Sequence, residues 1–197
     1  MNTLSSRDWR EYYRRTGERP PRPTLLFALD RFETPGVAVD LGCGGGRDAV
    51  EMLRRGWTIY GIDPAASAEE ETLGRPDLPD TGTFSFINAA SFEAEWPECD
   101  LTNSSFALPI CPPECFPALW QRITDRLRPG GRFSGQLYGP RDTWFGRDGM
   151  TFHSRAEVDA LLKAWDVELL DEEEDDSVTP RGQAKHWHIW HIVARKR

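Results

Sequence analysis

Hydrophobic residues come in short runs along this chain, and segments with helical spacing separate the runs. Residues 37–41 are apolar on both faces except for Asp40, which predicts a buried parallel strand. Further strands are predicted at 57–63, 83–88, 99–108 (a strand with its exit), 133–138, 167–170 and 185–195. Helices are predicted at 4–16, 25–32, 47–56, 64–73, 116–127 and 154–165. This alternation predicts an α/β fold, a doubly wound parallel sheet closed by a final strand pair.

The N-terminal segment is set apart from the rest by a proline-rich linker at 18–23. Trp9, Tyr12 and Tyr13 share one face of the predicted helix, and Ser5 or Ser6 fits its N-cap. Six arginines between residues 7 and 22 make this end basic. Two interpretations stay open: a packed helix with a solvated face, or a lid whose aromatics cover a pocket while a guanidinium faces a carboxylate.

The bulk properties fit one domain over residues 1–197, with 1–22 as the helix and linker of a possible lid. A net charge of −8 makes nucleic acid an unlikely partner, and no stretch is long enough to span a membrane. The N-terminus does not read as a secretory signal, so we expect a cytoplasmic protein. The four cysteines are expected to be free thiols. The oligomeric state stays open between a monomer and a weak dimer.

The first strand leads into the glycines of residues 42–46 and then into a helix, and this unit makes a nucleotide-type site. A dinucleotide fingerprint fails when counted from Gly42, because Arg47 takes its last position, but it passes formally from Gly44. Asp63 ends the second strand, 17 residues past Gly46. A carboxylate at that place can accept both ribose hydroxyls of an adenosine.

The stretch Asp40-Leu41-Gly42-Cys43-Gly44-Gly45-Gly46 closely resembles motif I of the class I S-adenosylmethionine (SAM) methyltransferases. Leu127-Arg128-Pro129-Gly130-Gly131 looks like the turn before their fifth strand. The resemblance implies a seven-stranded sheet with its last strand antiparallel, and within the class the chain looks most like small bacterial enzymes of the tellurite-resistance and thiopurine methyltransferase type. It implies SAM as cofactor and S-adenosylhomocysteine as product. The cofactor-binding residues it implies are Asp40, Gly42, Cys43, Gly44, Asp63, Pro64, Ala90, Ser91 and Asn103.

One departure from that family lies after the third strand, where Ala90 stands at a position that is commonly an acid. Adenine contacts would then fall to the backbone or to Ser91. The frame Asn103-Ser104-Ser105-Phe106 also has the outline of the [D/N]-P-P-[F/Y] motif of amino-methyltransferases, without its prolines. This similarity leaves a nucleic-acid or protein N-methyltransferase open as an alternative.

The implied reaction is methyl transfer to a small-molecule acceptor, with catalysis mainly by proximity and orientation. The candidates for chemistry at the pocket are Asn103, Ser105, Tyr138, Arg141 and His186. His186 and His188 have the spacing of a metal pair on one strand face, but no third ligand is visible, so no metal is expected. A SAM-binding protein without catalysis stays open as a further alternative.

Overall fold

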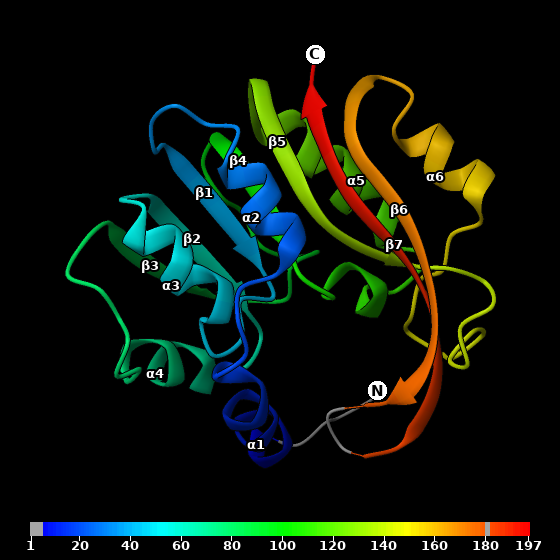
Figure 1. The fold of residues 1–197 in the computed structure, drawn as a ribbon, viewed down its shortest axis with the longest axis horizontal. Coiled ribbons are helices and arrows are strands. Elements are labelled where there is room, and N and C mark those ends of the chain that lie inside the picture. The colour runs from blue at the N-terminus through cyan, green and yellow to red at the C-terminus, as the bar shows by residue number, and fades with distance from the viewer. Residues whose placement is uncertain (1–5, 180–181) are drawn as a thin grey trace.

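The structure is a computed structural model that describes residues 6–179 and 182–197. Figure 1 shows one central sheet with helices on its two faces and α1 beyond one edge. The strands are β1 (Val37–Leu41), β2 (Thr58–Asp63), β3 (Thr83–Asn88), β4 (Cys99–Ser104), β5 (Leu127–Tyr138), β6 (Trp165–Val178) and β7 (Ala184–Lys196). The helices are α1 (Ser6–Gly17), α2 (Pro23–Leu29), α3 (Arg47–Arg54), α4 (Ser67–Leu73), η1 (Leu108–Ile110), α5 (Phe116–Arg126) and α6 (Arg155–Leu161).

The sheet has the strand order β3-β2-β1-β4-β5-β7-β6. The pairs from β3 to β5 are all parallel, whereas β7 runs antiparallel to both β5 and β6. The predicted doubly wound, seven-stranded sheet with an antiparallel last strand is therefore confirmed. The carboxyl ends of β1, β2 and β4 meet at one edge, which is where ligands bind in sheets of this kind.

Each face of the sheet is covered by its own hydrophobic cluster. On one face α5 packs against β5, β6 and β7, through side chains that include Trp120, Phe133 and Trp190. On the other face α2 and α3 pack against β1, β2 and β4, through side chains that include Leu25 and Met52. Strands that are apolar on both sides require this double cover, which explains the near-continuous hydrophobic runs in the sequence.

Several element bounds differ from those predicted, and two of these differences are large. Residues 127–131 lie inside β5 and are not a turn before it, so the helix ends at Arg126. The pairing with β4 shifts between Cys99 and Leu101, and Gly130 has a φ of 82°, so the glycines form an irregularity inside the strand. The second difference concerns the strand predicted at 167–170, which extends over Trp165–Val178 as β6, so that the acidic residues 171–176 form the arm of a long hairpin with β7.

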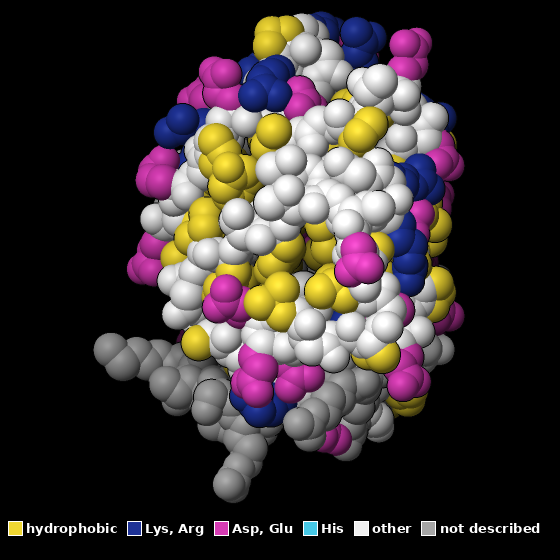
Figure 2. Space-filling view, turned by 90° about the vertical axis from the view of Figure 1, so that its left-hand side faces the viewer, with side chains coloured by type: hydrophobic (Ala, Val, Ile, Leu, Met, Phe, Trp, Pro, Cys, Tyr) yellow, Lys and Arg dark blue, Asp and Glu magenta, His cyan; other side chains and the backbone are white. Residues whose placement is uncertain are grey.

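The predicted helix 4–16 is α1, although its residues 4 and 5 lie outside the described residues. All four cysteines are free, as expected, and three of them are buried. Within the described ranges no helix is long and apolar enough to cross a membrane. On the side of the molecule shown in Figure 2, hydrophobic side chains reach the surface between charged ones.

Candidate functional site

The loop between β1 and α3 is shaped by glycines in the left-handed region. Gly44 and Gly46 have φ values of 51° and 73°, which side chains with a Cβ rarely adopt. A Cβ on Gly46 would also come within 2.6 Å of Thr72 on α4. The backbone N–H groups of Gly42 and Cys43 donate to the carbonyl oxygen of Ile62 at 2.7 and 3.1 Å. These bonds fix the loop against the end of β2.

Asp63, the last residue of β2, faces this loop. Its carboxylate accepts hydrogen bonds from the backbone N–H groups of Gly44 at 3.0 Å and Ala65 at 2.9 Å. A third bond comes from the hydroxyl of Tyr13 at 3.0 Å. Burial raises the pKa of Asp63, while the backbone donors act in the opposite direction. Asp63 is thus a buried carboxylate that already holds a hydroxyl group.

Helix α1 lies on the glycine loop and brings Tyr13 there. A Cβ added to Gly44 would lie 3.0 Å from the ring of Tyr13, and one added to Gly45 would lie 3.1 Å from Tyr13 Cβ. Burial and the nearby Asp63 raise the pKa of Tyr13, so its hydroxyl stays protonated and donates. An ion pair of 2.5 Å between Arg10 and Glu70 holds α1 against α4. Of the aromatic face predicted for this helix, Tyr13 is therefore buried against the loop, while Trp9 and Tyr12 are partly exposed.

Asp40 and Asn103 form a buried network behind the loop. The Asn103 Nδ2 group donates to Asp40 Oδ1 at 2.8 Å, and the Asn103 Oδ1 atom accepts from the Ser134 hydroxyl at 2.8 Å. The other oxygen of Asp40, Oδ2, is buried without a hydrogen-bond partner. Burial, and then the negative charge of Asp48, raise the pKa of Asp40. Such an orphaned carboxylate oxygen is costly unless a ligand or water donates to it.

Asp48 connects this network to the linker between α1 and α2. Its carboxylate accepts from Asn103 Nδ2 at 3.2 Å, from the Ser105 hydroxyl at 2.5 Å and from the backbone N–H of Arg22 at 2.9 Å. The guanidinium of Arg22 lies 4.3 Å from the centroid of the Phe106 ring. Ser105 therefore bonds to the first turn of α3, directly after the glycine loop, while the amide of Asn103 is bonded through both its nitrogen and its oxygen and positions two carboxylates.

Aromatic side chains gather beyond the ends of β4 and β5. Phe106 has a φ of 62°, an uncommon conformation for a residue with a bulky side chain. Its ring centroid lies 6.1 Å from that of Tyr138 and 6.4 Å from that of Trp187. Tyr138 is buried, and burial raises the pKa of its hydroxyl. The predicted Tyr138 thus lies in an aromatic wall next to Ser105 and Arg22.

A buried ion pair supports this wall. Lys185 and Asp142 are in direct contact, and both side chains are fully buried. The ammonium group of Lys185 also lies 4.1 Å from the ring centroid of Trp144 and 4.2 Å from that of Trp187. Asp142 in addition accepts from the backbone N–H groups of Trp144 and His188. The loop that follows β5 is therefore anchored to β7.

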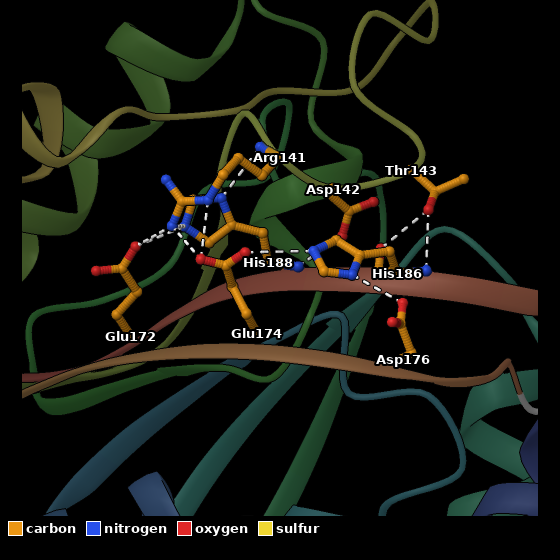
Figure 3. Close-up of polar contacts among 8 residues, drawn as sticks. All are labelled: Arg141, Asp142, Thr143, Glu172, Glu174, Asp176, His186 and His188. Carbon is orange, nitrogen blue, oxygen red and sulfur yellow. Dashed lines mark hydrogen bonds and ion pairs between the residues drawn. The ribbon is translucent and has the colours of Figure 1, made fainter.

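Arg141 and His186 point toward acidic side chains of β6, as Figure 3 shows. Arg141 pairs with Glu172 at 2.5 Å and donates from Nε to Glu174 at 2.8 Å. These hydrogen bonds hold the pKa of Glu174 down at about 2. The nitrogens of His186 contact Asp176 at 2.8 Å and Glu174 at 3.3 Å. The expectation that His186 faces the pocket is not met, because the β6–β7 register pairs it with Asp176.

The same register brings Glu172, Glu174 and His188 together, with candidate ligand atoms within 4.8 Å of one another. The backbone N–H of Arg141 donates to His188 Nδ1 at 3.1 Å, so the ring proton is on Nε2, which contacts Glu172 at 3.0 Å. A metal bound to Nε2 would displace this proton, and because Nδ1 already accepts a hydrogen bond, neither ring nitrogen would then carry a proton. The guanidinium of Arg141 also already supplies a positive charge to this cluster. The cluster is therefore an ion-pair network.

The remaining predicted residues lie around Asp63 or behind the loop. Pro64 follows Asp63 directly, and Ala90 and Ser91 come just after β3, next to Asp63 at the same sheet edge. Cys43 is buried, and its sulfur would lie 3.0 Å from a Cβ on Gly61. Burial and the nearby Asp40 raise the pKa of this thiol well above its ordinary value. Cys43 is therefore a packing residue of the loop, and its side chain is directed toward β2.

Three contributors to this region are missed by sequence reasoning. In the sequence Asp48 is noticeable only as part of a predicted helix start, although an acid in the first helical turn after a glycine loop is a usable signal. Ser134 carries no signal, because a serine inside a strand has many uses. The pair of Lys185 and Asp142 could be suspected only from a lone lysine within an otherwise aromatic strand.

The fold is shared with solved methyltransferase structures. The structure of TehB from Haemophilus influenzae superposes with a TM-score of 0.77 at 14% identity, covering 94% of this chain and 66% of TehB. The 1,6-didemethyltoxoflavin-N1-methyltransferase of Burkholderia thailandensis, solved with 1,6-didemethyltoxoflavin and S-adenosylhomocysteine bound, gives a TM-score of 0.65 at 19% identity. That match covers 97% of this chain and 86% of the other.

Sequence comparison gives the same class. Residues 38–131 match the family model of a methyltransferase domain. A ribosomal RNA small subunit methyltransferase C from Alcanivorax borkumensis is 39% identical over 59 residues, which are 27% of this chain and 18% of that relative. The chain thus spans about two thirds of TehB, and the match covers less than a fifth of the curated relative. Residues 38–131 therefore match a methyltransferase domain, and the chain has the fold of solved methyltransferases.

Proposed function

We propose that this protein transfers a methyl group from SAM to a small-molecule acceptor. The observation that carries the proposal is Asp63, a buried carboxylate fixed beside a glycine loop and already bonded to a hydroxyl group. An adenosine ribose offers two hydroxyls to such a carboxylate. Asp63 would accept them in place of the phenol of Tyr13.

The residues behind the loop also fit SAM. The orphaned Oδ2 of Asp40 can accept a proton donor, and the amino group of the methionine part is one. The loop glycines permit close approach, because each lacks the Cβ that would fill the space above the loop. In this proposal Gly42, Gly44 and Asp63 hold SAM, with Pro64, Ala90 and Ser91 bordering the adenine.

Bound SAM supplies a methyl carbon that the positively charged sulfur already activates. The protein then has mainly to align the acceptor and to exclude water. Asn103 would hold Asp40 and Asp48 in place, while Ser105 and Tyr138 border the acceptor. Arg141 and His186 are left out of this set, because their side chains bond to the hairpin.

We treat residues 1–197 as one methyltransferase domain in which residues 1–22 form a lid. Tyr13 of α1 lies against Gly44 and Gly45 and bonds to Asp63, which supports a position of α1 over the glycine loop. Closure of this helix would exclude water from the reacting groups.

The four free cysteines fit a reducing compartment, and we assign the protein to the cytoplasm.

A small molecule is favoured as acceptor because the chain carries a net charge of −8. The toxoflavin-type enzyme with the same fold is, by its name, an enzyme that acts on a small molecule. An RNA acceptor has one observation in its favour, the short match to a ribosomal RNA methyltransferase. The acidic net charge opposes it, since nucleic-acid binding relies on neutralising phosphates.

The experiment that tests this function is thermal unfolding with SAM, S-adenosylhomocysteine or NAD. A ligand that binds only the native state stabilises it by RT ln(1 + [L]/Kd), about 2.7 kcal/mol at a concentration of ~100 Kd. We expect SAM and S-adenosylhomocysteine to raise the Tm and NAD to leave it unchanged. The absence of a shift with millimolar SAM would contradict the proposal.

A further inference from the structure

The aromatic wall beyond β4 and β5 is centred on Tyr138 and is only partly covered by the rest of the protein. The ring centroid of Tyr138 lies 6.1 Å from that of Phe106, 6.0 Å from that of Trp187, 6.2 Å from that of Trp144 and 6.1 Å from that of Phe152. The four outer rings are partly exposed, whereas Tyr138 is buried. Partly exposed aromatic rings at the ligand-binding edge of a sheet indicate a surface that contacts a ligand.

The wall begins next to the glycine loop. Phe106 directly follows Ser105, whose hydroxyl bonds to Asp48 in the first turn of α3. Phe106 is also the residue with a φ of 62°, a conformation that costs a bulky side chain free energy and persists only where the surroundings enforce it. Strained residues of this kind gather at ligand sites. The wall therefore adjoins the cofactor loop through a residue whose backbone is held in an unusual conformation.

The hydroxyl of Tyr138 is a polar group for which the protein supplies no partner. Tyr138 is 4% exposed, yet its hydroxyl makes no hydrogen bond to any residue within 6–179 and 182–197. Its oxygen is not sealed off from solvent as Asp40 Oδ2 is. Burial, and then the negative charge of Asp142, raise the pKa of this hydroxyl, so it stays protonated and is able to donate. A desolvated donor without a partner is costly, so a ligand that offers an acceptor atom fits this place.

The protein's own cations take the positions that a cationic ligand would need on this wall. The guanidinium of Arg22 lies 4.3 Å from the ring centroid of Phe106. The ammonium group of Lys185 lies 4.1–5.0 Å from three further ring centroids of the wall. Asp142 is paired with Lys185 and is not free to bind a ligand cation. A ligand on the wall is therefore neutral or anionic, since a further cation would meet like charges.

We infer that the methyl acceptor is a planar aromatic molecule without positive charge, which packs against the rings of Phe106 and Trp187 and accepts a hydrogen bond from the Tyr138 hydroxyl through an oxygen or nitrogen of its own. The inference rests on the proposed function, because it presupposes that SAM lies on the glycine loop. In the transfer, a lone pair of the acceptor that is not used in this hydrogen bond forms the bond to the methyl carbon. The carbon–sulfur bond breaks, and its electron pair stays on the sulfur of S-adenosylhomocysteine. An acceptor that binds as a hydroxyl releases its proton to water.

The test is isothermal titration calorimetry of the unchanged protein, loaded with S-adenosylhomocysteine, with probes of similar size. 2-Naphthol has a planar ring system and a hydroxyl, quinoline has a ring nitrogen in place of the hydroxyl, and naphthalene has the rings alone. Decahydro-2-naphthol has the hydroxyl but no aromatic ring. Because contacts between aromatic rings add to the burial of apolar surface, 2-naphthol or quinoline is expected to bind about tenfold more tightly than decahydro-2-naphthol. The tighter of the two identifies the acceptor atom as oxygen or nitrogen.

Variants of the wall separate the contribution of the hydroxyl from that of the rings. Tyr138→Phe keeps the ring, so its affinity for the tighter polar probe should fall by about 2- to 10-fold, the range for one hydrogen bond, while its affinity for naphthalene should not fall. Phe106→Leu keeps an apolar side chain and should weaken the aromatic probes but not decahydro-2-naphthol. Tyr60→Phe is the matched control and should alter no affinity, since Tyr60 is on β2, which β1 separates from β4.

Each other outcome has a defined meaning. Decahydro-2-naphthol binding as tightly as both polar aromatic probes, or no saturable binding of either at millimolar concentration, would overturn the inference and leave SAM binding intact. Equal losses for naphthalene and the polar probe in Tyr138→Phe would do the same. If circular dichroism shows that a variant does not fold, the comparison of probes on the unchanged protein still decides. Absence of S-adenosylhomocysteine binding by the unchanged protein would overturn the proposed function and the inference together, and only this result does so.

Discussion

The hydrogen bond from Tyr13 to Asp63 leads to a prediction in which protein stability and ligand affinity change in opposite directions. Tyr13→Phe removes the hydroxyl and keeps the ring on Gly44 and Gly45. The bond is 3.0 Å long, and both side chains are about 5% exposed. A hydrogen bond to a charged group contributes about 1.5–3 kcal/mol, so the free energy of unfolding should fall by about that amount.

The effect on cofactor affinity follows because the Tyr13 hydroxyl and the ribose hydroxyls compete for the same acceptor, the carboxylate of Asp63. Asp63 Oδ1 already accepts from Ala65 and Tyr13, and Oδ2 accepts from Gly44. A carboxylate has about four acceptor sites, and three of them are used, so both ribose hydroxyls can bond to Asp63 only if the phenol leaves. The native protein loses the Tyr13 bond in that step. Every 1.4 kcal/mol corresponds to about tenfold in affinity. Tyr13→Phe should therefore bind S-adenosylhomocysteine about tenfold more tightly, or better.

Urea unfolding and calorimetry on the same preparations would measure both quantities. Tyr12→Phe is the control, since it removes a neighbouring phenol hydroxyl and keeps the ring contacts with Trp9 and Tyr13, and neither quantity should change appreciably. If Tyr13→Phe instead binds S-adenosylhomocysteine more weakly, then the phenol contacts the cofactor and does not compete with it. That outcome would refute the competition between phenol and ribose for Asp63.

Three further changes test other parts of the structure. Asp63→Ala should weaken S-adenosylhomocysteine binding by about 1.5–3 kcal/mol per lost charged hydrogen bond, measured by calorimetry, with the fold retained by circular dichroism; unchanged affinity would place the ribose elsewhere. Burial lowers the pKa of His153 to about 4, so the unfolded state takes up a proton first as the pH falls below about 6.5. His153 should therefore lower the free energy of unfolding by up to about 1.4 kcal/mol per pH unit as the pH falls from 6.5 toward 4. In urea unfolding, the free energy of His153→Gln should decrease less with falling pH than that of the parent protein, and equal pH dependences would contradict this. Lys185→Met leaves Asp142 buried and unpaired and should destabilise by about 3–5 kcal/mol in urea, whereas Arg155→Met, at an exposed pair, should cost about 1 kcal/mol or less. A small loss in Lys185→Met would show that Asp142 finds another partner.

Local patterns were sufficient for the parts of this protein that depend on neighbours along the chain. The strand of residues 37–41, the glycine loop and the acid at the end of β2 follow from apolar runs, small residues and helix starts. A buried strand must be apolar on both faces wherever it occurs, so the sheet could be predicted from its strands. The same reasoning found Asp40 and Asp63, because both stand at strand ends that the fold brings to one edge.

Other features depended on contacts between distant segments, and only the tertiary structure decided them. Asn103 is 63 residues from Asp40, and nothing along the chain shows that its amide holds that carboxylate. His186 and Arg141 looked like site residues until the β6–β7 register placed their acidic partners opposite them. The bond of Tyr13 to Asp63 joins residues 50 positions apart. Such pairs are selected by packing geometry and by the need to satisfy buried polar groups, and neither leaves a periodic signal in the sequence.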